Sequence, residues 1–172
     1  MGTRNLTVVK LDKEVKVAQY CQWDGYPEGQ GAGIVEFLTS EMEPRKFRKN
    51  LRASKFISDK KISGKWKRCG AGDSNFVSCE VSDAFLKEYP ELHRDTGSKI
   101  LALIQDKPRE LCNSISFGKD GLFCEWSYEI NLDRRVLKVF KSGYDNGPVA
   151  TLKIGKTLKS EWRKYLESRG EE

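Results

Sequence analysis

Residues 19–33 form the part of the chain that is richest in side chains able to do chemistry. Trp23 and Tyr26 carry large rings that can stack on a base or close a core, and Asp24 is the only acid between them. Four glycines and one proline give the same stretch backbone conformations that other residues avoid. We therefore interpret residues 19–33 as a shaped loop that contains a binding site.

The glycines at residues 29–33 could cradle a phosphate, because they let backbone amides approach an anion and a following helix adds partial positive charge. The spacing is not G-x-G-x-x-G, and it lacks the Gly-Lys-Ser/Thr of a P-loop. The preceding strands form a predicted hairpin instead of opening a βαβ unit, so a dinucleotide-binding fold is not predicted. The alternative is a purely conformational role for these glycines.

The side chains of the loop each have a structural alternative. Asp24 could turn the chain at the following glycine, or it could orient a ligand or the chain terminus. Trp23 and Tyr26 could stack on a base or complete the core. The core is favoured for Trp23 and the site for Tyr26.

A second candidate cluster starts a predicted helix at residues 93–97, where Asp95 or Thr96 would serve as the cap. Arg94 is unfavourable at a helix N-terminus, which indicates a partner elsewhere, either an anion or a carboxylate such as Glu125 or Asp24. Glu125 lies in an otherwise apolar and aromatic stretch and must be paired if it points inward. The predicted ligand-binding residues are Thr3, Arg4, Gln22, Asp24, Tyr26, Arg94 and Glu125.

The net charge of +6 is concentrated in one stretch. From Arg45 to Arg68 there are eleven lysines or arginines and one acid, Asp59, with aromatic residues between them. This pattern fits contact with phosphate backbones, and the alternative is a solvated helix face followed by a basic loop. The residues predicted to contact nucleic acid or a protein partner are Arg45, Arg48, Lys49, Arg52, Lys65, Trp66, Lys67 and Arg68.

The composition predicts a globular protein with one domain, residues 1–172, and a mobile basic segment at residues 53–78. No run of 18 apolar residues and no apolar N-terminal region occur, so neither a membrane span nor a secretory signal is predicted and we expect a cytoplasmic location. The five cysteines form no C-x-x-C pair and only one histidine accompanies them. We therefore expect reduced thiols, no metal site and no cofactor.

Hydrophobic periodicity and turn residues predict an α+β fold. An antiparallel sheet would be built from N-terminal and C-terminal hairpins, with a helical block between them and a C-terminal helix. The predicted strands are 6–11, 15–22, 121–131, 136–141 and 149–154. Helices are predicted to start near residue 31, to start at residue 41 with Ser40 as the cap, and to span 82–89 with Ser82 as the cap, 96–106 and 157–168, while 55–78 is predicted to be irregular.

Four motifs of the chain resemble a family of small uncharacterised proteins found mainly in phages, with relatives in bacteria and fungi. They are the Gly-Thr-Arg opening at 2–4, the Trp-Asp-Gly-Tyr-Pro-Glu-Gly-Gln-Gly loop at 23–31, the Arg-Asp-Thr-Gly run at 94–97 and the Cys-Glu-Trp-Ser-Tyr…Leu-Asp hairpin at 124–133. The resemblance spans most of the chain. It implies a phage accessory protein, often one that counters host defence, and it brings no activity with it.

A fainter resemblance is to N-terminal-nucleophile amidohydrolases of the bile-salt-hydrolase type, which also begin with a short strand and a hairpin that carries an aspartate. In those enzymes the residue after the initiator methionine is a cysteine that acts as nucleophile and base. Gly2 occupies that position here and has no nucleophilic group, and Thr3 would need a further cleavage. The resemblance therefore implies a binding scaffold without the chemistry.

The leading hypothesis is a phage-encoded accessory protein in the host cytosol that antagonises a defence by binding an anionic ligand, either a nucleotide-type small molecule or nucleic acid. No residue is assigned a catalytic role, and no membrane partner is expected. Two alternatives stay open. One is an N-terminal-nucleophile-like amidohydrolase, and the other is an inhibitor that docks on a host defence protein or ribonucleoprotein through the basic segment.

Overall fold

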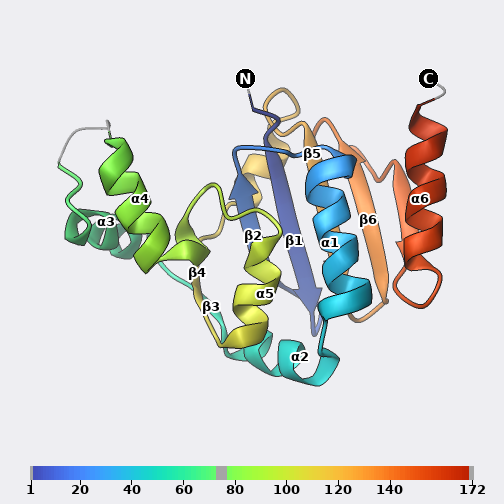
Figure 1. Cartoon of the computed structure of the whole chain (residues 1–172), viewed down its shortest axis with the longest axis horizontal. Coiled ribbons are helices and arrows are strands. Elements are labelled where there is room, and N and C mark those ends of the chain that lie inside the picture. Colours follow the sequence, from blue (N-terminus) through green and yellow to red (C-terminus); the bar gives the residue numbers. More distant parts are fainter. Residues whose placement is uncertain (1, 73–76, 171–172) are drawn as a thin grey trace.

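A computed structural model describes residues 2–72 and 77–170 of the chain. Its centre is a five-stranded sheet with the strand order β2-β1-β5-β6-β7, and helices cover one face of that sheet (Figure 1). The strands are β1 (Asn5–Leu11), β2 (Glu14–Cys21), β5 (Trp126–Asn131), β6 (Val136–Lys141) and β7 (Ala150–Lys153). The fold is α+β, as predicted, with N-terminal and C-terminal hairpins in one sheet and a C-terminal helix, α6 (Leu158–Arg169).

The turn between β1 and β2 has two residues, Asp12 and Lys13, both with positive φ (56° and 65°). Such a turn matches the right-handed twist of two antiparallel strands. The Asp133 carboxylate, from the turn between β5 and β6, accepts the backbone N–H groups of Asp12 and Lys13 at 3.0 and 2.9 Å. These hydrogen bonds lower the pKa of Asp133 and connect the turns of the two hairpins.

The two hairpins share the sheet through β1 and β5, which pair in parallel from Asn5↔Trp126 to Lys10↔Asn131. The other three strand pairs are antiparallel. The sheet is therefore mixed at this one junction, where a purely antiparallel sheet was predicted. A parallel pair needs a long crossover connection, and the helices between β2 and β5 provide it.

One face of the sheet is packed against helices from the middle and the end of the chain (Figure 1). The first is a continuous helical run made of η1 (Pro27–Gly31), α1 (Ala32–Glu36) and η2 (Phe37–Glu41), in which η1 and η2 are π-helical turns. The others are α5 (Lys99–Asp106) and α6. Ile34, Leu101, Ile130 and Trp162 belong to the main buried core between these helices and the sheet.

The remaining helices lie at the margins of the sheet. α2 (Pro44–Ala53) lies at the edge where the first hairpin turns, and α3 (Asp59–Arg68) and α4 (Cys79–Glu88) project to one side (Figure 1). The short strands β3 (Lys55–Phe56) and β4 (Glu110–Leu111) form a second small sheet next to them. The 3₁₀ turns η3 (Pro90–Leu92) and η4 (Ile115–Lys119) complete the described elements.

The prediction of an irregular segment at 55–78 is wrong for residues 59–68, which form α3. The Ser58 hydroxyl caps this helix by accepting the N–H of Lys61. The Trp66 ring stacks on Phe85 of α4, with the ring centroids 3.6 Å apart and the planes 2° from parallel. The partner ring is distant in sequence, so the local pattern did not reveal the helix. Residues 73–76 of the predicted mobile segment lie outside the described residues.

Several predicted boundaries also differ because the capping residues were misassigned. α2 begins at Pro44, three residues after the predicted start, since proline favours the first turn of a helix. α4 begins at Cys79 with Ser78 as its cap, where Ser82 was predicted. α5 begins only at Lys99, and β5 begins only at Trp126, after a turn at 121–123 that was predicted as strand.

The second face of the sheet is covered in part by η4 and by Tyr144. Glu129 of β5 points into this face with its side chain 3% exposed, and its carboxylate lies 2.7 Å from Lys10 Nζ and 3.5 Å from Lys138 Nζ. The Tyr144 hydroxyl donates to the same carboxylate. Burial alone would raise the pKa of Glu129, but the hydrogen bonds from Lys10 and Tyr144 outweigh it and lower the pKa. Burial and this hydrogen bond raise the pKa of Tyr144 to about 12.

Within residues 2–72 and 77–170, no helix is long and apolar enough to cross a membrane. Over the same ranges no three side chains of the metal-binding types are grouped to hold an ion. All five cysteines are free thiols.

From the contacts of Glu129 with Lys10, Lys138 and Tyr144, we predict a contribution to stability that is lost in acid. We expect Glu129→Gln to lower the free energy of unfolding by about 2 kcal/mol at neutral pH, because it leaves two lysines beside a neutral amide. The folded pKa is below the unfolded value of about 4.3, so the wild-type contribution is present above that pH and is lost as the pH falls through the folded pKa. Urea unfolding at several pH values measures both effects.

The matched control is Glu14→Gln, which removes an exposed carboxylate paired with Lys16 at 2.5 Å. An exposed ion pair of this kind contributes little, so we expect a change within about 0.5 kcal/mol. Equal losses in the two variants would contradict the assignment of Glu129 as a buried anchor of the sheet.

Candidate functional site

The loop at residues 22–26, directly after β2, lies against two segments that are distant in sequence. The backbone N–H of Gly25 donates to the Thr3 carbonyl at 3.0 Å, and the N–H of Gln22 donates to the Arg94 carbonyl at 3.1 Å. The Asn5 side-chain amide donates to the Trp23 carbonyl at 3.2 Å. The structure therefore brings the start of the chain, the loop and the segment before α5 together at one end of the strands, where β1 begins and β2 ends.

The backbone of this loop has a strained conformation that its neighbours hold in place. Asp24 has φ = +52°, in the left-handed region that side chains rarely adopt. Gly25 lies so close to the chain start that a Cβ atom would be 2.6 Å from the Thr3 carbonyl oxygen. The Tyr128 hydroxyl donates to the Gly25 carbonyl at 2.7 Å from the buried side of the sheet. Backbone strain of this kind is concentrated at functional sites in proteins.

Gln30 is a buried residue that sequence reasoning missed and that ties the site together. Its backbone N–H donates to the Asp24 carbonyl at 2.8 Å, and its side-chain amide donates to Thr7 Oγ1 at 2.8 Å. Its side-chain oxygen accepts the N–H of Ser98 at 3.0 Å, beside Gly97 with φ = +56°. A polar residue in the first turn of a predicted helix gave no signal that it would be buried.

Two adjoining cavities open around Trp23 at this edge, and we call them together the Trp23 cleft. The first has a volume of 330 Å³ and is lined by Cys21, Trp23, Asp24, Gly29, Gln30, Asp95, Thr96, Gly97, Ser98 and Lys99. The second has a volume of 550 Å³ and is lined by Trp23, Trp66, Val77, Ser78, Cys79, Ser82, Asp83, Arg94 and Asp95. Trp23 and Asp95 belong to both, and these volumes are in the usual range for small-molecule sites.

The charges that line the cleft are mixed. Asp24, Asp83 and Asp95 provide three carboxylates, and Arg94 and Lys99 provide two cations. A ligand that meets all of them needs hydrogen-bond donors as well as negative charge. The predicted ligand-binding residues also combined carboxylates and cations, and Asp24 and Arg94 are the charged residues that the prediction and the lining share.

Of the predicted ligand-binding residues, the cleft lining includes Asp24 and Arg94. Thr3 is buried, with 5% of its surface exposed, and it supports the loop through its carbonyl. Gln22 supports it through its backbone N–H, and its side-chain oxygen accepts the Tyr20 hydroxyl.

The other three predicted residues also lie outside the cleft lining, as Thr3 and Gln22 do. Tyr26 is 52% exposed. Arg4 and Glu125 contact each other instead, through the Arg4 N–H and a Glu125 carboxylate oxygen at 3.2 Å. The Arg4 guanidinium also lies 4.6 Å from the centre of the Phe123 ring. The inward-pointing alternative for Glu125 is wrong, because this side chain is exposed.

Trp23, predicted to favour the core, is 47% exposed and lines the cleft. The core positions beneath the loop are occupied by Tyr128 and by Trp162, whose ring lies against the backbone of Gly31. The loop backbone thus rests on two buried aromatic side chains, and the Trp23 ring is left at the surface. Sequence alone could not rank these three aromatic residues for burial.

The basic stretch does not surround the cleft. α2 lies at the opposite edge of the sheet from the chain start (Figure 1). There Arg48 donates to the Leu132 carbonyl at 2.7 Å, and Arg52 pairs with Asp12 at 2.7 Å. Arg45 and Lys49 are exposed on the same helix. The cations of α2 therefore lie away from the cleft, because α2 and α3 extend in different directions from the sheet (Figure 1).

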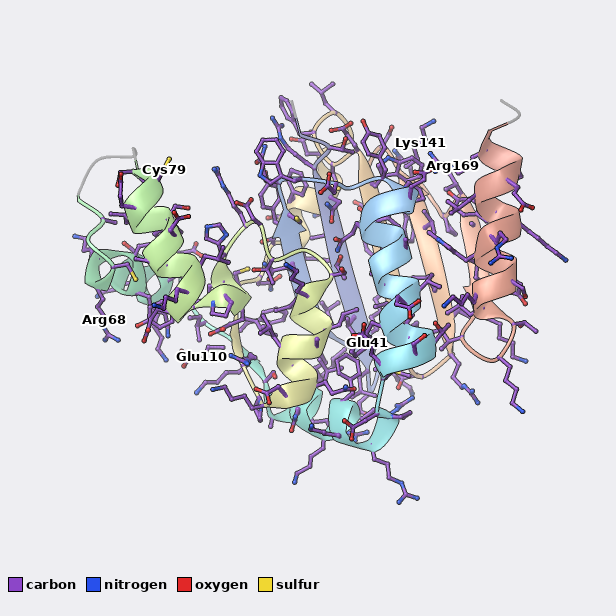
Figure 2. The ribbon with its side chains drawn as sticks, in the orientation of Figure 1. Glu41, Arg68, Cys79, Glu110, Lys141 and Arg169 are labelled. Carbon is purple, nitrogen blue, oxygen red and sulfur yellow. The ribbon has the colours of Figure 1, made fainter. Side chains whose placement is uncertain are left out.

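Two lysines of α3, Lys61 and Lys65, pair with Glu110 of β4. Lys65 Nζ lies 3.3 Å from the Glu110 carboxylate and 4.1 Å from the centre of the Tyr89 ring. Arg68 lies at the outer end of the helix (Figure 2). Among the α3 residues predicted to contact a partner, Trp66 is the one that lines the cleft.

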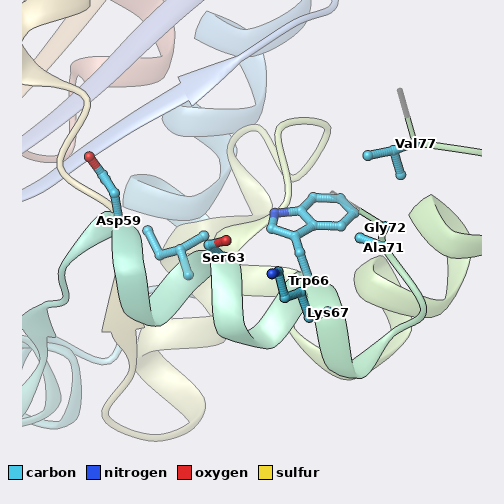
Figure 3. A pocket seen from close by; sticks show the side chains of 8 residues that line it. Asp59, Ser63, Trp66, Lys67, Ala71, Gly72 and Val77 are labelled. Atoms are coloured by element: carbon cyan, nitrogen blue, oxygen red, sulfur yellow. The ribbon is translucent and has the colours of Figure 1, made fainter. Parts of the chain in front are cut away.

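A third cavity, of 320 Å³, lies next to α3 and is lined in part by Trp66 and Lys67 (Figure 3). It shares Trp66 and Val77 with the larger cavity of the Trp23 cleft. The rest of its described lining is Asp59, Ile62, Ser63, Ala71, Gly72 and Val77. We assign no ligand to it, because residues 73–76, which connect Gly72 and Val77 in the sequence, lie outside the described residues.

His93 lies buried beneath the larger cavity, with Ser82 and Asp95 beside it. Its Nδ1 accepts the backbone N–H of Asp95 at 3.1 Å, and its Nε2 is 3.0 Å from Ser82 Oγ. An accepting Nδ1 places the proton of neutral histidine on Nε2, so that His93 donates to Ser82. A serine nucleophile needs the opposite arrangement, with an unprotonated nitrogen facing the hydroxyl. Burial lowers the pKa of His93 and favours its neutral form.

Comparison of the chain with known protein families, with curated proteins and with solved structures finds no match in any of the three.

The contact between Gly25 and Thr3 predicts that the loop tolerates no side chain at position 25. We expect Gly25→Ala to destabilise the protein by about 2 kcal/mol, because the added Cβ meets a backbone oxygen and cannot be relieved by a rotamer change. The control is Gly64→Ala in α3, where no atom lies within 4 Å of the new Cβ. Alanine favours a helix, so the control should be stabilised by up to about 1 kcal/mol. Urea unfolding of both variants measures the change in the free energy of unfolding, which should be negative for Gly25→Ala and positive for Gly64→Ala.

The hydrogen bonds of His93 predict its tautomer. Because the chain contains one histidine, its imidazole nitrogens give one set of NMR signals. We expect the Nε2–H form at neutral pH and a titration midpoint below the usual value of about 6.5. Stability should then fall as the pH drops below about 6.5, because the unfolded chain binds a proton that the folded chain does not. An Nδ1–H form would contradict this assignment, because Nε2 would then accept a hydrogen bond from the Ser82 hydroxyl.

Proposed function

We propose that this protein binds a nucleotide-type small molecule in the Trp23 cleft and does not transform it. The observation that carries the proposal is the position of Trp23, a half-exposed indole shared by two adjoining cavities whose lining includes Arg94 and Lys99. An indole held at the surface beside cations offers a stacking surface for a base and charge for its phosphate. The base would stack on Trp23, with the phosphate directed to Arg94 and Lys99.

The carboxylates of the cleft favour a nucleotide over a simple anion such as inorganic phosphate. Asp24 and Asp95 are acceptors, and the edges of nucleobases carry N–H donors that can pair with carboxylates. The same carboxylates would repel a strand with a phosphate at every residue, so a free nucleotide suits this cleft better than a polynucleotide. The ligand is therefore expected to combine a polar aromatic ring with a negatively charged group.

A binding role without catalysis agrees with the environment of the candidate nucleophiles. The Ser82 hydroxyl oxygen accepts a hydrogen bond from His93 Nε2–H, in the tautomer that the Asp95 N–H selects. Thr3 is buried and its carbonyl is occupied by Gly25, which disfavours the amidohydrolase alternative. A protein that sequesters a nucleotide would suit the phage accessory role that the resemblance implies, acting against a host defence in the cytosol.

Isothermal titration calorimetry at low salt tests the proposal with ribonucleoside monophosphates and triphosphates of all four bases. Ribose 5-phosphate and the free nucleosides serve as partial ligands. We expect one nucleotide to bind more tightly than either of its parts. Trp23→Ala and Arg94→Gln should each weaken binding by about ten-fold or more, the size expected for one stacking or one charged contact.

Two matched controls separate the cleft from its surroundings. Tyr26→Ala removes an exposed ring just outside the lining, and Arg45→Gln removes one positive charge from α2. Neither should change the affinity by more than about two-fold. Absence of binding by every nucleotide, or full affinity in Trp23→Ala, would overturn the proposal.

A further inference from the structure

Four segments of the chain meet at the end of the strands that is opposite the Trp23 cleft. They are the turn between β1 and β2, helix α2, the turn between β5 and β6, and residues 154–157 before α6 (Figure 1). Arg48 of α2 donates to the Leu132 carbonyl at 2.7 Å, and the Ile154 N–H donates to the Arg135 carbonyl at 2.8 Å. These contacts make the four segments one continuous surface.

The acids of this surface are engaged, and most of its cations are not. Asp12 receives two hydrogen bonds from Arg52, at 2.7 and 3.0 Å, and Asp133 accepts two backbone N–H groups. Over the described parts of the chain, no ion pair engages six exposed cations, which we call the basic face: Lys13, Arg45, Lys49, Arg134, Arg135 and Lys156. Figure 2 shows nitrogen-tipped side chains projecting from α2 away from the sheet. The surface therefore carries an unbalanced positive charge.

A groove of 240 Å³ runs through the basic face, between α2 and the turn of the second hairpin. Five of its seven lining residues are apolar and the other two are arginines, one from each wall, Arg48 and Arg135. The apolar residues are Met42, Pro44, Phe47, Leu132 and Ile154. The groove suits a flat apolar ring that carries negative charge on both of its sides.

We propose that the basic face binds single-stranded nucleic acid, with one base in the groove and the neighbouring phosphates on the cations. A nucleotide within a strand has a phosphate on its 5′ side and another on its 3′ side, which matches a groove with cations on both walls. An acidic peptide has no such regular placement of charge around an aromatic ring. A duplex keeps its bases paired and stacked, so it cannot insert one without paying to unpair it.

This proposal is separate from the small-molecule function of the Trp23 cleft. The two surfaces lie at opposite ends of the strands and share no lining residue. Only part of the basic stretch of the sequence belongs to the basic face, because α2 contributes cations to it and α3 does not. The new contributors are the two hairpin turns and the segment before α6.

Fluorescence anisotropy tests whether the basic face binds single strands. The probes are labelled single-stranded DNA and RNA of mixed sequence, about 12 nucleotides in length. About four phosphate contacts predict a slope of about −3 for the logarithm of the binding constant against the logarithm of the salt concentration. We expect the blunt duplex of the same sequence to bind about ten-fold more weakly. Equal binding of the duplex or of poly-glutamate, or no binding at low salt, would overturn the proposal.

Matched variants locate the contact. Arg134→Gln combined with Arg135→Gln removes two charges from the face and should weaken single-strand binding by about ten-fold. Lys60→Gln combined with Lys119→Gln removes the same charge from exposed positions elsewhere and should change it by less than about two-fold. Equal weakening by the two double variants would show that only net charge matters and would overturn the site. Trp23→Ala should leave oligonucleotide binding intact, so failure of the nucleotide proposal and failure of this one are distinguishable.

Discussion

Parallel pairing of β1 with β5 is the constraint on which both candidate surfaces depend. The two strands run in the same direction from Asn5↔Trp126 to Lys10↔Asn131, so their starts share one edge of the sheet and their ends share the other. At the first edge the chain start meets the loop after β2. At the second edge both hairpins turn, and Asp133 accepts hydrogen bonds from the backbone of the first turn. Apolar side chains of β1 are buried on both faces of the sheet, so a shift of this register would disrupt the packing on both faces.

The Trp23 cleft is shaped mainly by backbone and buried polar contacts. Gln30 connects the first helical run to the start of α5 and to Thr7 of β1, and Tyr128 supports the Gly25 carbonyl from below. The Gln30 amide and the Tyr128 hydroxyl are paired, so a different geometry of the loop would leave buried donors or acceptors without these partners. The framework therefore leaves Trp23 at the surface in a fixed place. A preorganised aromatic wall loses little entropy when a ligand stacks on it.

Charge is distributed unevenly between the two edges. The cleft has three carboxylates and two cations, whereas the basic face has six exposed cations and acids that are already hydrogen-bonded. One reason is that Arg52 of α2 pairs with Asp12, one of the two acids in the hairpin turns. The six exposed cations outnumber the other acid, Asp133, so their field extends into solvent within the screening length of about 8 Å.

The local pattern of the sequence was sufficient for the fold class, for the two hairpins and for most of the helices. Short apolar runs bounded by turn residues predicted β1, β2 and β6 to within one residue. It also predicted that the loop after β2 is unusual, from its glycines and aromatics. It failed for α3, whose stability depends on Trp66 stacking on Phe85 of another helix.

The composition of the candidate site was decided by tertiary structure. Whether Trp23, Tyr128 or Trp162 would be buried depended on which ring reaches the space beneath the loop, and each comes from a different part of the chain. Gln30 became a central residue only because Ser98 and Thr7 were brought to it. The sequence by itself determined the types of side chain, the charge and the local conformations. Only the tertiary structure decided which of these side chains meet. Contacts between distant segments depend on the register of β1 against β5, which the local periodicity of the sequence does not indicate.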